Sequence, residues 1–204
     1  MTPVIRGRGT GLRSARGQSI VEFAIILPFL LLIVLGVVET SYALLDQHVV
    51  TKLAREGSNL IARDTSLTQA ARVMQSMGTA PVNLAPGGTS TVIFSVLKKG
   101  ATTGTTNFGQ VVLFQRYQFG SLAASSRLTA GSTAMGGPPD YQAVNPDTNA
   151  SLQITNLPDS IINVNGGFLY VTEVFTRHQL LTPLDRLLPY GVTLPSTLYS
   201  IAYF

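Results

Sequence analysis

Residues 16–38 read RGQSIVEFAIILPFLLLIVLGVV, and this stretch decides how the rest of the chain is arranged. No charged residue occurs from Phe23 to Val38, and thirteen of these positions are Leu, Ile, Val or Phe. At about −0.3 to −0.6 kcal/mol each, these side chains favour membrane insertion by about 4 to 8 kcal/mol. Glu22 lies at the edge of the run, where an acid costs less than the roughly 2.5 to 3.5 kcal/mol at a helix centre. The stretch therefore predicts a transmembrane helix.

The charges of the chain orient this helix. Of 14 Lys and Arg residues, four arginines (Arg6, Arg8, Arg13 and Arg16) precede the first acid, Glu22. Positive flanks stay in the cytoplasm, so we expect the N-terminus inside and everything after the helix outside. From Gln18 onward ten basic residues balance ten acids. A nucleic-acid partner is not expected, because the folded part has no excess of positive charge.

Composition sets further bounds. The 204 residues suffice for one membrane anchor and one small domain. Charged residues make up 12%, against about 25% in ordinary soluble proteins. The absence of cysteine excludes disulfides and thiolate metal sites.

Glu22 has two interpretations. In the first, its carboxylate reaches the head-group region from the edge of the membrane helix. In the second, Gly17 five positions upstream, the basic leader and the apolar helix resemble the processing site of type IV pilin-like proteins. That resemblance implies that a prepilin peptidase cuts after Gly17, which makes Gln18 the first mature residue and Glu22 the fifth. It also implies that Glu22 pairs with the N-terminal amine of a neighbouring subunit, and an acid in low dielectric does need such a partner.

A cleavable secretory signal is a competing interpretation of the same region. Small residues at Ser41 and Ala43 suit a signal peptidase, but the apolar run exceeds the roughly 7 to 15 residues of a signal core. Glu39 also falls just before this cleavage point.

The helix is predicted to continue beyond the membrane, from near Ser19 to Ile61. One face carries apolar residues at helical spacing: Tyr42, Leu45, Val49, Leu53 and Leu60. Pro28 removes one backbone donor and is expected to bend the axis locally. A second helix is predicted from Leu67 to Met77, with Gly78 and Pro81 ending it.

Four further segments make the resemblance specific. They are Gly17-Gln18-Ser19-Ile20-Val21-Glu22-Phe23-Ala24, Leu27-Pro28, Val38-Glu39, and Leu53-Ala54-Arg55-Glu56-Gly57. Together they are similar to the TadE-like family, minor pseudopilins of the tight adherence (Tad, Flp-type) pilus system. The similarity covers about Arg16 to Ile61. One departure is Phe23, where Flp-type processing motifs prefer tyrosine, and it bears on which peptidase accepts the site.

After Pro81 the composition shifts to Gly, Thr, Ser, Asn and β-branched residues. Strands are predicted at Thr91–Lys98, Val111–Phe119, Phe168–Arg177 and Thr197–Phe204, with a short one at Ser151–Thr155. Residues 121–146 are predicted to form a long loop, 165–167 a turn, and Pro183–Leu188 a short helix. The last strand is expected to add to the Phe168 strand. The fold class is α+β, with a long N-terminal membrane helix continuing onto a small antiparallel sheet, as in pilins.

Catalytic residues are not apparent. His48 and His178 are expected on the helix surface and at a strand end, and neither has a nearby acid at a recognised spacing. No nucleotide-binding, hydrolase or metalloprotease motif occurs, so we expect no enzyme activity and no cofactor or metal.

The domains are therefore a removable basic leader at 1–17, a transmembrane helix at 18–45, an amphipathic continuation at 46–80 and an extracytoplasmic α+β domain at 81–204. The processing site is Gly17 and Gln18, and the assembly motif is Glu22, Phe23 and Pro28. The resemblance implies, as partners, prepilin peptidase, other pilin or pseudopilin subunits, the inner-membrane assembly platform and membrane lipid. Two alternatives stay open: an uncleaved, single-pass envelope protein whose outer domain binds a ligand or partner, and an exported protein cut after Ala43.

Overall fold

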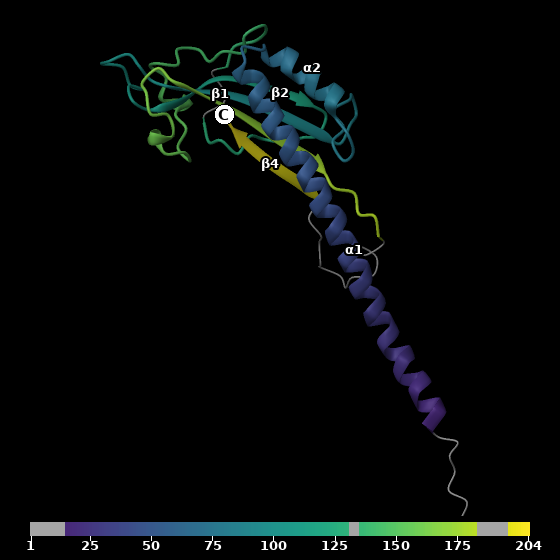
Figure 1. Ribbon diagram of the computed structural model, residues 1–204. Helices are drawn as coiled ribbons and strands as arrows, with labels where there is room; N and C mark the ends of the chain where they lie inside the picture. Colours follow the sequence, from purple (N-terminus) through teal and green to yellow (C-terminus); the bar gives the residue numbers. More distant parts are fainter. Residues whose placement is uncertain (1–14, 131–134, 183–195) are drawn as a thin grey trace, which may run out of the picture. The chain divides into compact units, whose positions relative to one another are not determined.

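The computed structural model describes residues 15–130, 135–182 and 196–204. These residues form two helices and four strands, together with two short 3-10 helices (Figure 1). The chain divides into two compact units. The described residues of the first unit are 15–41 and 180–182, and those of the second are 42–130, 135–179 and 196–204.

The first helix, α1, runs from Ala15 to Ala62 as one element of 48 residues with Pro28 inside it. The prediction of a single long helix is confirmed, and its first turn includes residues 15–17, which had been assigned to the leader. At its C-terminal end Arg63 N donates to Leu60 O at 3.2 Å, and Asp64 adopts a left-handed conformation with φ 60°. The chain thereby leaves the helical path directly after Ala62.

The second helix, α2, spans Leu67–Met77, as predicted. Ser66 caps its start, because the Ser66 side chain accepts a hydrogen bond from Gln69 N. Gly78 ends it. The buried positions Leu67, Ala70, Ala71 and Met74 recur at spacings of three and four, and this face packs into the core.

The sheet contains β1 (Ser90–Lys99), β2 (Val111–Gly120), β3 (Phe168–Arg177) and β4 (Thr197–Tyr203). All pairs are antiparallel, in the order β2-β1-β3-β4. The four long strands were predicted to within one residue at each end, and β4 does pair with β3. The α+β fold class is confirmed.

The second half of α1 and α2 pack against one face of the sheet (Figure 1). Alternating β1 residues Val92, Phe94 and Val96 point toward them, since successive strand side chains face opposite sides. The residues contributed by α1 are Val50, Leu53, Ala54 and Ile61. The predicted apolar stripe was partly wrong: Tyr42 and Leu45 are exposed, and the buried stripe is centred about one residue later.

Gly57 marks the closest approach of α1 to the sheet. A Cβ added at Gly57 would lie 2.7 Å from Met74 Sδ and 2.7 Å from Thr172 Cγ2. The next residue, Ser58, is buried and donates to Ala202 O at 2.9 Å, which fastens α1 to β4. Any side chain at Gly57 would overlap the side chains of Met74 and Thr172, so these side chains or the helix would have to shift.

The other face of the sheet is covered by the long connection between β2 and β3. Leu97, Leu113 and Val171 form a second core with Leu128, Leu152 and Ile162 from that connection. Within its described residues, 121–146 contains neither a helix nor a strand longer than an isolated bridge, as expected for a loop.

The predicted strand at Ser151–Thr155 was wrong. Residues Ala150–Leu152 form a 3-10 turn capped by Asn149, and only Gln153 bridges to Val112 of β2. The Asn149 side chain accepts from Ser151 N, which favours a turn over an extended strand. The turn at 165–167 is present, with Gly166 at φ 83°. The helix predicted at Pro183–Leu188 and most of the basic leader lie outside the described residues.

Candidate processing and assembly site

Gly17, Gln18 and Glu22 lie in the first two turns of α1 and all three are exposed. Gln18 Nε2 donates to Glu22 Oε1 at 3.0 Å, so the two side chains are joined one helical turn apart. A Cβ added at Gly17 would meet no atom within 4 Å. The fold of the described chain therefore gives no packing reason for glycine at this position.

Phe23 and Pro28 follow on the same helix. The Phe23 side chain is 62% exposed and contributes to no core of this chain. Pro28 lacks the N–H that would bond to Ala24 O, yet the helix continues through it. The five residues expected to form the site are thus brought together along 12 positions of one helix.

The apolar run of α1 has no covering partner among the described residues. The helix contains an 18-residue window of mean hydropathy 2.9, none of which is buried. Its exposed large side chains are Ile20, Val21, Phe23, Ile25, Ile26, Leu27, Phe29, Leu30, Leu31, Ile33, Val34 and Val37. Such a surface is unstable in water, and it is compatible with a single-pass membrane anchor.

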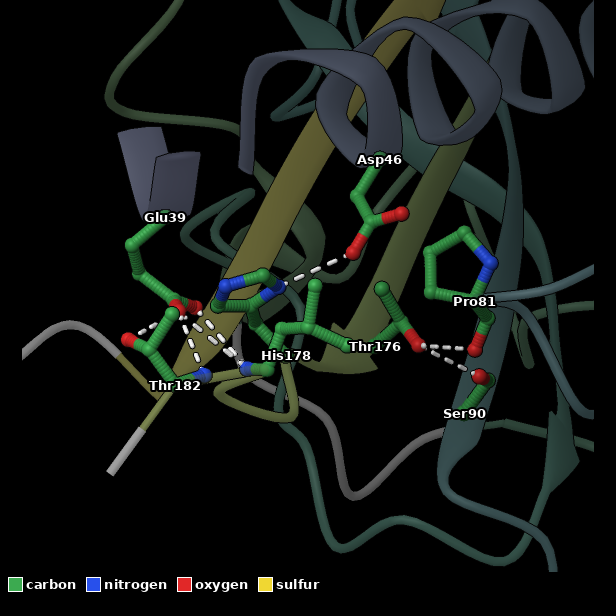
Figure 2. Close-up of polar contacts among 8 residues, drawn as sticks. Glu39, Asp46, Pro81, Ser90, Thr176, His178 and Thr182 are labelled. Carbon is green, nitrogen blue, oxygen red and sulfur yellow. Dashed lines mark hydrogen bonds and ion pairs between the residues drawn. The ribbon is translucent and has the colours of Figure 1, made fainter. Parts of the chain in front are cut away.

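Glu39 follows this run, and the sequence places it in the Val38-Glu39 segment of the resemblance without predicting its burial or its contacts. Glu39 is only 6% exposed, although Ile33, Val34 and Val37 on the two preceding turns are exposed. Its carboxylate accepts hydrogen bonds from Leu181 N (3.2 Å), Thr182 N (3.0 Å) and Thr182 Oγ1 (2.7 Å), as Figure 2 shows. Through these bonds Glu39, on α1, holds Leu181 and Thr182, which follow β3 in the chain. The signals in the sequence are the Val38-Glu39 segment itself and an acid that stands directly after sixteen uncharged residues.

His178 directly follows β3, at the strand end where it was predicted. Its Nδ1 lies 2.9 Å from Asp46 Oδ2, an acid 132 positions earlier (Figure 2). Local spacing could not have found this pair. His48, in contrast, is exposed on α1, as predicted. In the part of the chain that the structure describes, no three His, Asp or Glu residues cluster as metal ligands.

A buried hydroxyl network joins β1 and β3 at their adjacent ends. Thr176 Oγ1 donates to Pro81 O at 3.1 Å and lies 2.7 Å from Ser90 Oγ (Figure 2). Ser90 Oγ in turn accepts from Asn83 N. These bonds fix the chain between α2 and β1 where it enters the sheet.

Glu173 is a fully buried acid on the sheet face opposite the helices. Its carboxylate accepts from Arg127 N (2.8 Å) and from the Tyr199 hydroxyl (3.0 Å), and also from Ser126 Oγ. The Arg127 guanidinium stacks 3.7 Å from the centre of the Tyr199 ring. A buried carboxylate needs hydrogen-bond partners, and those of Glu173 on β3 come from the β2–β3 connection and from β4. The network therefore ties these three parts of the chain together.

The pKa values of two tyrosines, Tyr199 and Tyr203, are shifted by this environment. Burial raises the pKa of Tyr199, and the adjacent Glu173 carboxylate raises it further, because a phenolate there would face a negative charge. Burial also raises the pKa of Tyr203, with Glu173 adding to the effect. For Arg116 burial lowers the pKa, and Glu173 opposes that shift. All three groups lie in the field of the Glu173 carboxylate.

Fold and site together define a protein with one long N-terminal apolar helix, whose second half packs on a four-stranded antiparallel sheet. Residues 17–59 match the family model described as TadE-like protein, so the resemblance is confirmed over this segment. The match includes Gly17, Glu22, Glu39 and Gly57, and it indicates an association with the Tad pilus system. No curated protein and no solved structure matches the chain.

Proposed function

We propose that this chain is a minor pseudopilin that takes part in assembly or initiation of a Tad/Flp-type pilus. The observation that carries the proposal lies within the family match: Gly17, Gln18 and Glu22 stand at the start of an apolar helix that the described residues leave uncovered. In a membrane the helix is surrounded by lipid, and in a filament it packs against the corresponding helices of neighbouring pilin subunits. The chain is a structural subunit and not an enzyme.

Cleavage after Gly17 by a prepilin peptidase is the first step of this function. The Gly17–Gln18 bond lies in the first turn of α1, whose N–H groups have no partner within the helix. Glycine weakens a helix by about 1 kcal/mol relative to alanine, so this turn opens at low cost for a peptidase. Because Gly17 is exposed and has no side chain, it fits a peptidase pocket that is too small for any other residue.

Assembly follows cleavage. The new amine at Gln18 gives a neighbouring subunit's Glu22 a positive partner in low dielectric. The retained protein sits in the inner membrane with its N-terminus in the cytoplasm and residues 81–204 in the periplasm. The assembly platform and the other pilin subunits then extract it from lipid into the filament.

The mature N-terminus tests the proposal. Intact-mass measurement of the wild-type protein should give a chain that begins at Gln18, and cells lacking the prepilin peptidase should give the full-length chain. Gly17→Leu should block the cut, because a pocket shaped for glycine cannot hold leucine. Gly36→Leu is the matched control, since Gly36 also lies on α1 with no atom within 4 Å of an added Cβ.

A mature protein that begins at Leu44, or still at Met1 in cells with active peptidase, would overturn the processing step. The uncleaved envelope protein is then the better description. One observation favours the uncleaved envelope protein: the hydrogen bond from Gln18 gives the Glu22 carboxylate a partner without cleavage.

A further inference from the structure

The connection between β2 and β3 carries one sequence of the form Asn-x-Ser, Asn149-Ala150-Ser151. No other asparagine of the chain is followed two positions later by Ser or Thr. Such a tripeptide is the acceptor for N-linked glycosylation, in which the side-chain nitrogen of the asparagine receives an oligosaccharide. The tripeptide alone often arises by chance, and the residues around it decide whether it is usable.

An acid extends this sequence. Asp147 stands two positions before Asn149, and bacterial oligosaccharyltransferases prefer an acceptor with an acid at this position. The longer motif arises by chance less often than the tripeptide. One Asp147 oxygen lies 3.5 Å from Lys98 Nζ, and the other accepts from Thr102 Oγ1 at 3.2 Å. The Asp147 side chain is still 34% exposed, so an enzyme can reach it.

The hydroxyl of the tripeptide lies against the amide of its asparagine. Asn149 Oδ1 accepts hydrogen bonds from Ser151 Oγ at 2.8 Å and from Ser151 N at 3.0 Å. Both bonds draw electron density toward Oδ1 and make the Nδ2–H groups of Asn149 more acidic. An amide nitrogen is a poor nucleophile until it loses a proton. The local fold therefore favours reaction at Asn149 Nδ2.

This nitrogen is not engaged by the fold. Asn107 Nδ2, for comparison, donates to Pro146 O and to Asn149 O. Asn156 Nδ2 donates to Arg127 O. Asn149 Nδ2 donates to no other residue of the described chain, and it is not fully buried. It is therefore open to solvent and to a second substrate.

The tripeptide lies at the surface of the second unit. Thr148, Ala150 and Ser151 are exposed, and Asn149 is half-buried. The backbone here forms the three-residue 3-10 turn Ala150–Leu152, which is anchored in the core by Leu152. Short turns of this kind open locally while the sheet stays folded. A transferase can therefore bind the acceptor in an extended form without unfolding β2 or β3.

We propose that Asn149 is an N-glycosylation site, and that its donor substrate is an oligosaccharide linked to a polyprenyl pyrophosphate. Asn149 Nδ2 attacks the anomeric carbon of the first sugar, and a bond between nitrogen and carbon forms. The bond from that carbon to the pyrophosphate oxygen breaks, and the polyprenyl pyrophosphate leaves with the electron pair. One Nδ2 proton passes to a carboxylate of the transferase.

The modification uses none of the residues of the processing and assembly site. It rests on the proposed function in one respect: transfer from a lipid-linked donor occurs on the periplasmic side, where residues 81–204 are proposed to lie. A glycan at Asn149 leaves both cores intact, because the nitrogen that carries it belongs to neither cluster.

The test is transfer in vitro, which does not depend on where the chain lies in a cell. The full-length protein in detergent micelles is incubated with a purified bacterial oligosaccharyltransferase and a polyprenyl-pyrophosphate-linked oligosaccharide. Intact mass is then measured. The wild type should gain the mass of one oligosaccharide. Asn149→Asp should gain none, although aspartate keeps an oxygen that accepts from Ser151.

Two further positions supply matched variants. Ser151→Ala should slow transfer at least about tenfold, because a site that binds a hydroxyl rejects substrates that lack it. Ser151→Thr should restore transfer. Asn156→Asp removes another side-chain amide of the same connection, outside the tripeptide, and should be modified as wild type.

A wild-type protein that stays unmodified in vitro, or a glycan that persists in Asn149→Asp, would overturn the proposal. Neither result bears on the pilus function. Expression in cells that contain the same transferase and donor tests the location separately. Transfer in vitro without transfer in those cells would contradict the periplasmic placement of residues 81–204 and leave the site intact.

Discussion

At the scale of single residues, Glu22 separates cleavage from assembly. Glu22→Gln keeps the size of the side chain and its hydrogen bond to Gln18, but removes the charge. The helix should insert slightly better, because the cost of the acid is gone. The attraction to a neighbour's amine is lost, and we expect a protein that is made, inserted and cut, yet forms no pili and does not co-purify with other pilins.

Arg63→Gln serves as the control for Glu22→Gln. Arg63 is exposed just beyond α1 and should tolerate the change with normal piliation. Electron microscopy of sheared pili and co-purification measure the outcome. Normal piliation of the Glu22→Gln strain would leave the glutamate as a residue that only reaches the head groups.

At the scale of elements, Gly57 sets the distance between α1 and the sheet. Gly57→Ala places a methyl group 2.7 Å from Met74 Sδ and Thr172 Cγ2, where real contacts are much longer. Overpacking of this kind costs about 1 to 3 kcal/mol. We expect the second unit to unfold at a lower urea midpoint than in the wild type. Limited proteolysis of the protein in detergent measures this midpoint.

Gly36→Ala is the matched control for this prediction. It makes the same substitution on the same helix, at a position where the new Cβ meets nothing within 4 Å. Its urea midpoint should equal that of the wild type or exceed it, because alanine favours a helix. Equal midpoints for both variants would show that the contact at Gly57 accommodates a methyl group without loss of stability.

Glu39 controls how the segment after β3 is held. Glu39→Gln removes the charge that all these donors face, and one oxygen becomes an NH₂ group, so Leu181 N, which lies 3.2 Å from both oxygens, loses one of its two acceptors. Hydrogen bonds to a charged group contribute about 1.5 to 3 kcal/mol, so amide exchange at Leu181 and Thr182 should become at least about tenfold faster. Exchange at wild-type rates would mean that other contacts hold this segment.

The elements were largely predictable because each carries a local pattern. Alternation in Val92, Phe94 and Val96 predicts β1, and the spacing of Leu67, Ala70, Ala71 and Met74 predicts α2. The site at Gly17 and Glu22 was also local. The burial of Glu39 and the pair of His178 with Asp46 depend on residues more than 100 positions apart, which no local pattern encodes. The pairing of β1 with β3 likewise joins residues as distant as Val92 and Val174.

Two misjudged elements have physical causes. The apolar stripe predicted on α1 ran from Tyr42 to Leu60, but Tyr42 and Leu45 are exposed. Small residues (Ala54, Gly57 and Ser58) line much of the actual contact, and hydropathy gives them little weight. At Ser151–Thr155, the side chain of Asn149 competes for the backbone and forms a turn.

At the scale of the whole molecule, the tyrosines around Glu173 predict alkaline sensitivity. The folded state raises the pKa of Tyr199 by burial and by the nearby carboxylate. The neutral phenol therefore stabilises the fold below the ordinary tyrosine pKa of about 10, and this contribution is lost as the pH rises above it. Urea midpoints should fall steeply above about pH 10.

Tyr199→Phe removes this titration together with the hydrogen bond to Glu173. The variant should be less stable than wild type at pH 7, and its midpoint should fall less steeply in alkali. Parallel curves for the two proteins would assign the alkaline loss to other groups.

The hydrogen bond from Ser58 to Ala202 has a consequence for biogenesis. The ribosome makes residues 42–62 well before β4, the last of the described strands, which accepts hydrogen bonds from Ser58 Oγ and from Gln47 Nε2. Until β4 is made, the sheet-binding face of the helix lacks this partner. A nascent chain stalled before Thr197 should therefore be a client for chaperones, and release of the last strand should end that dependence.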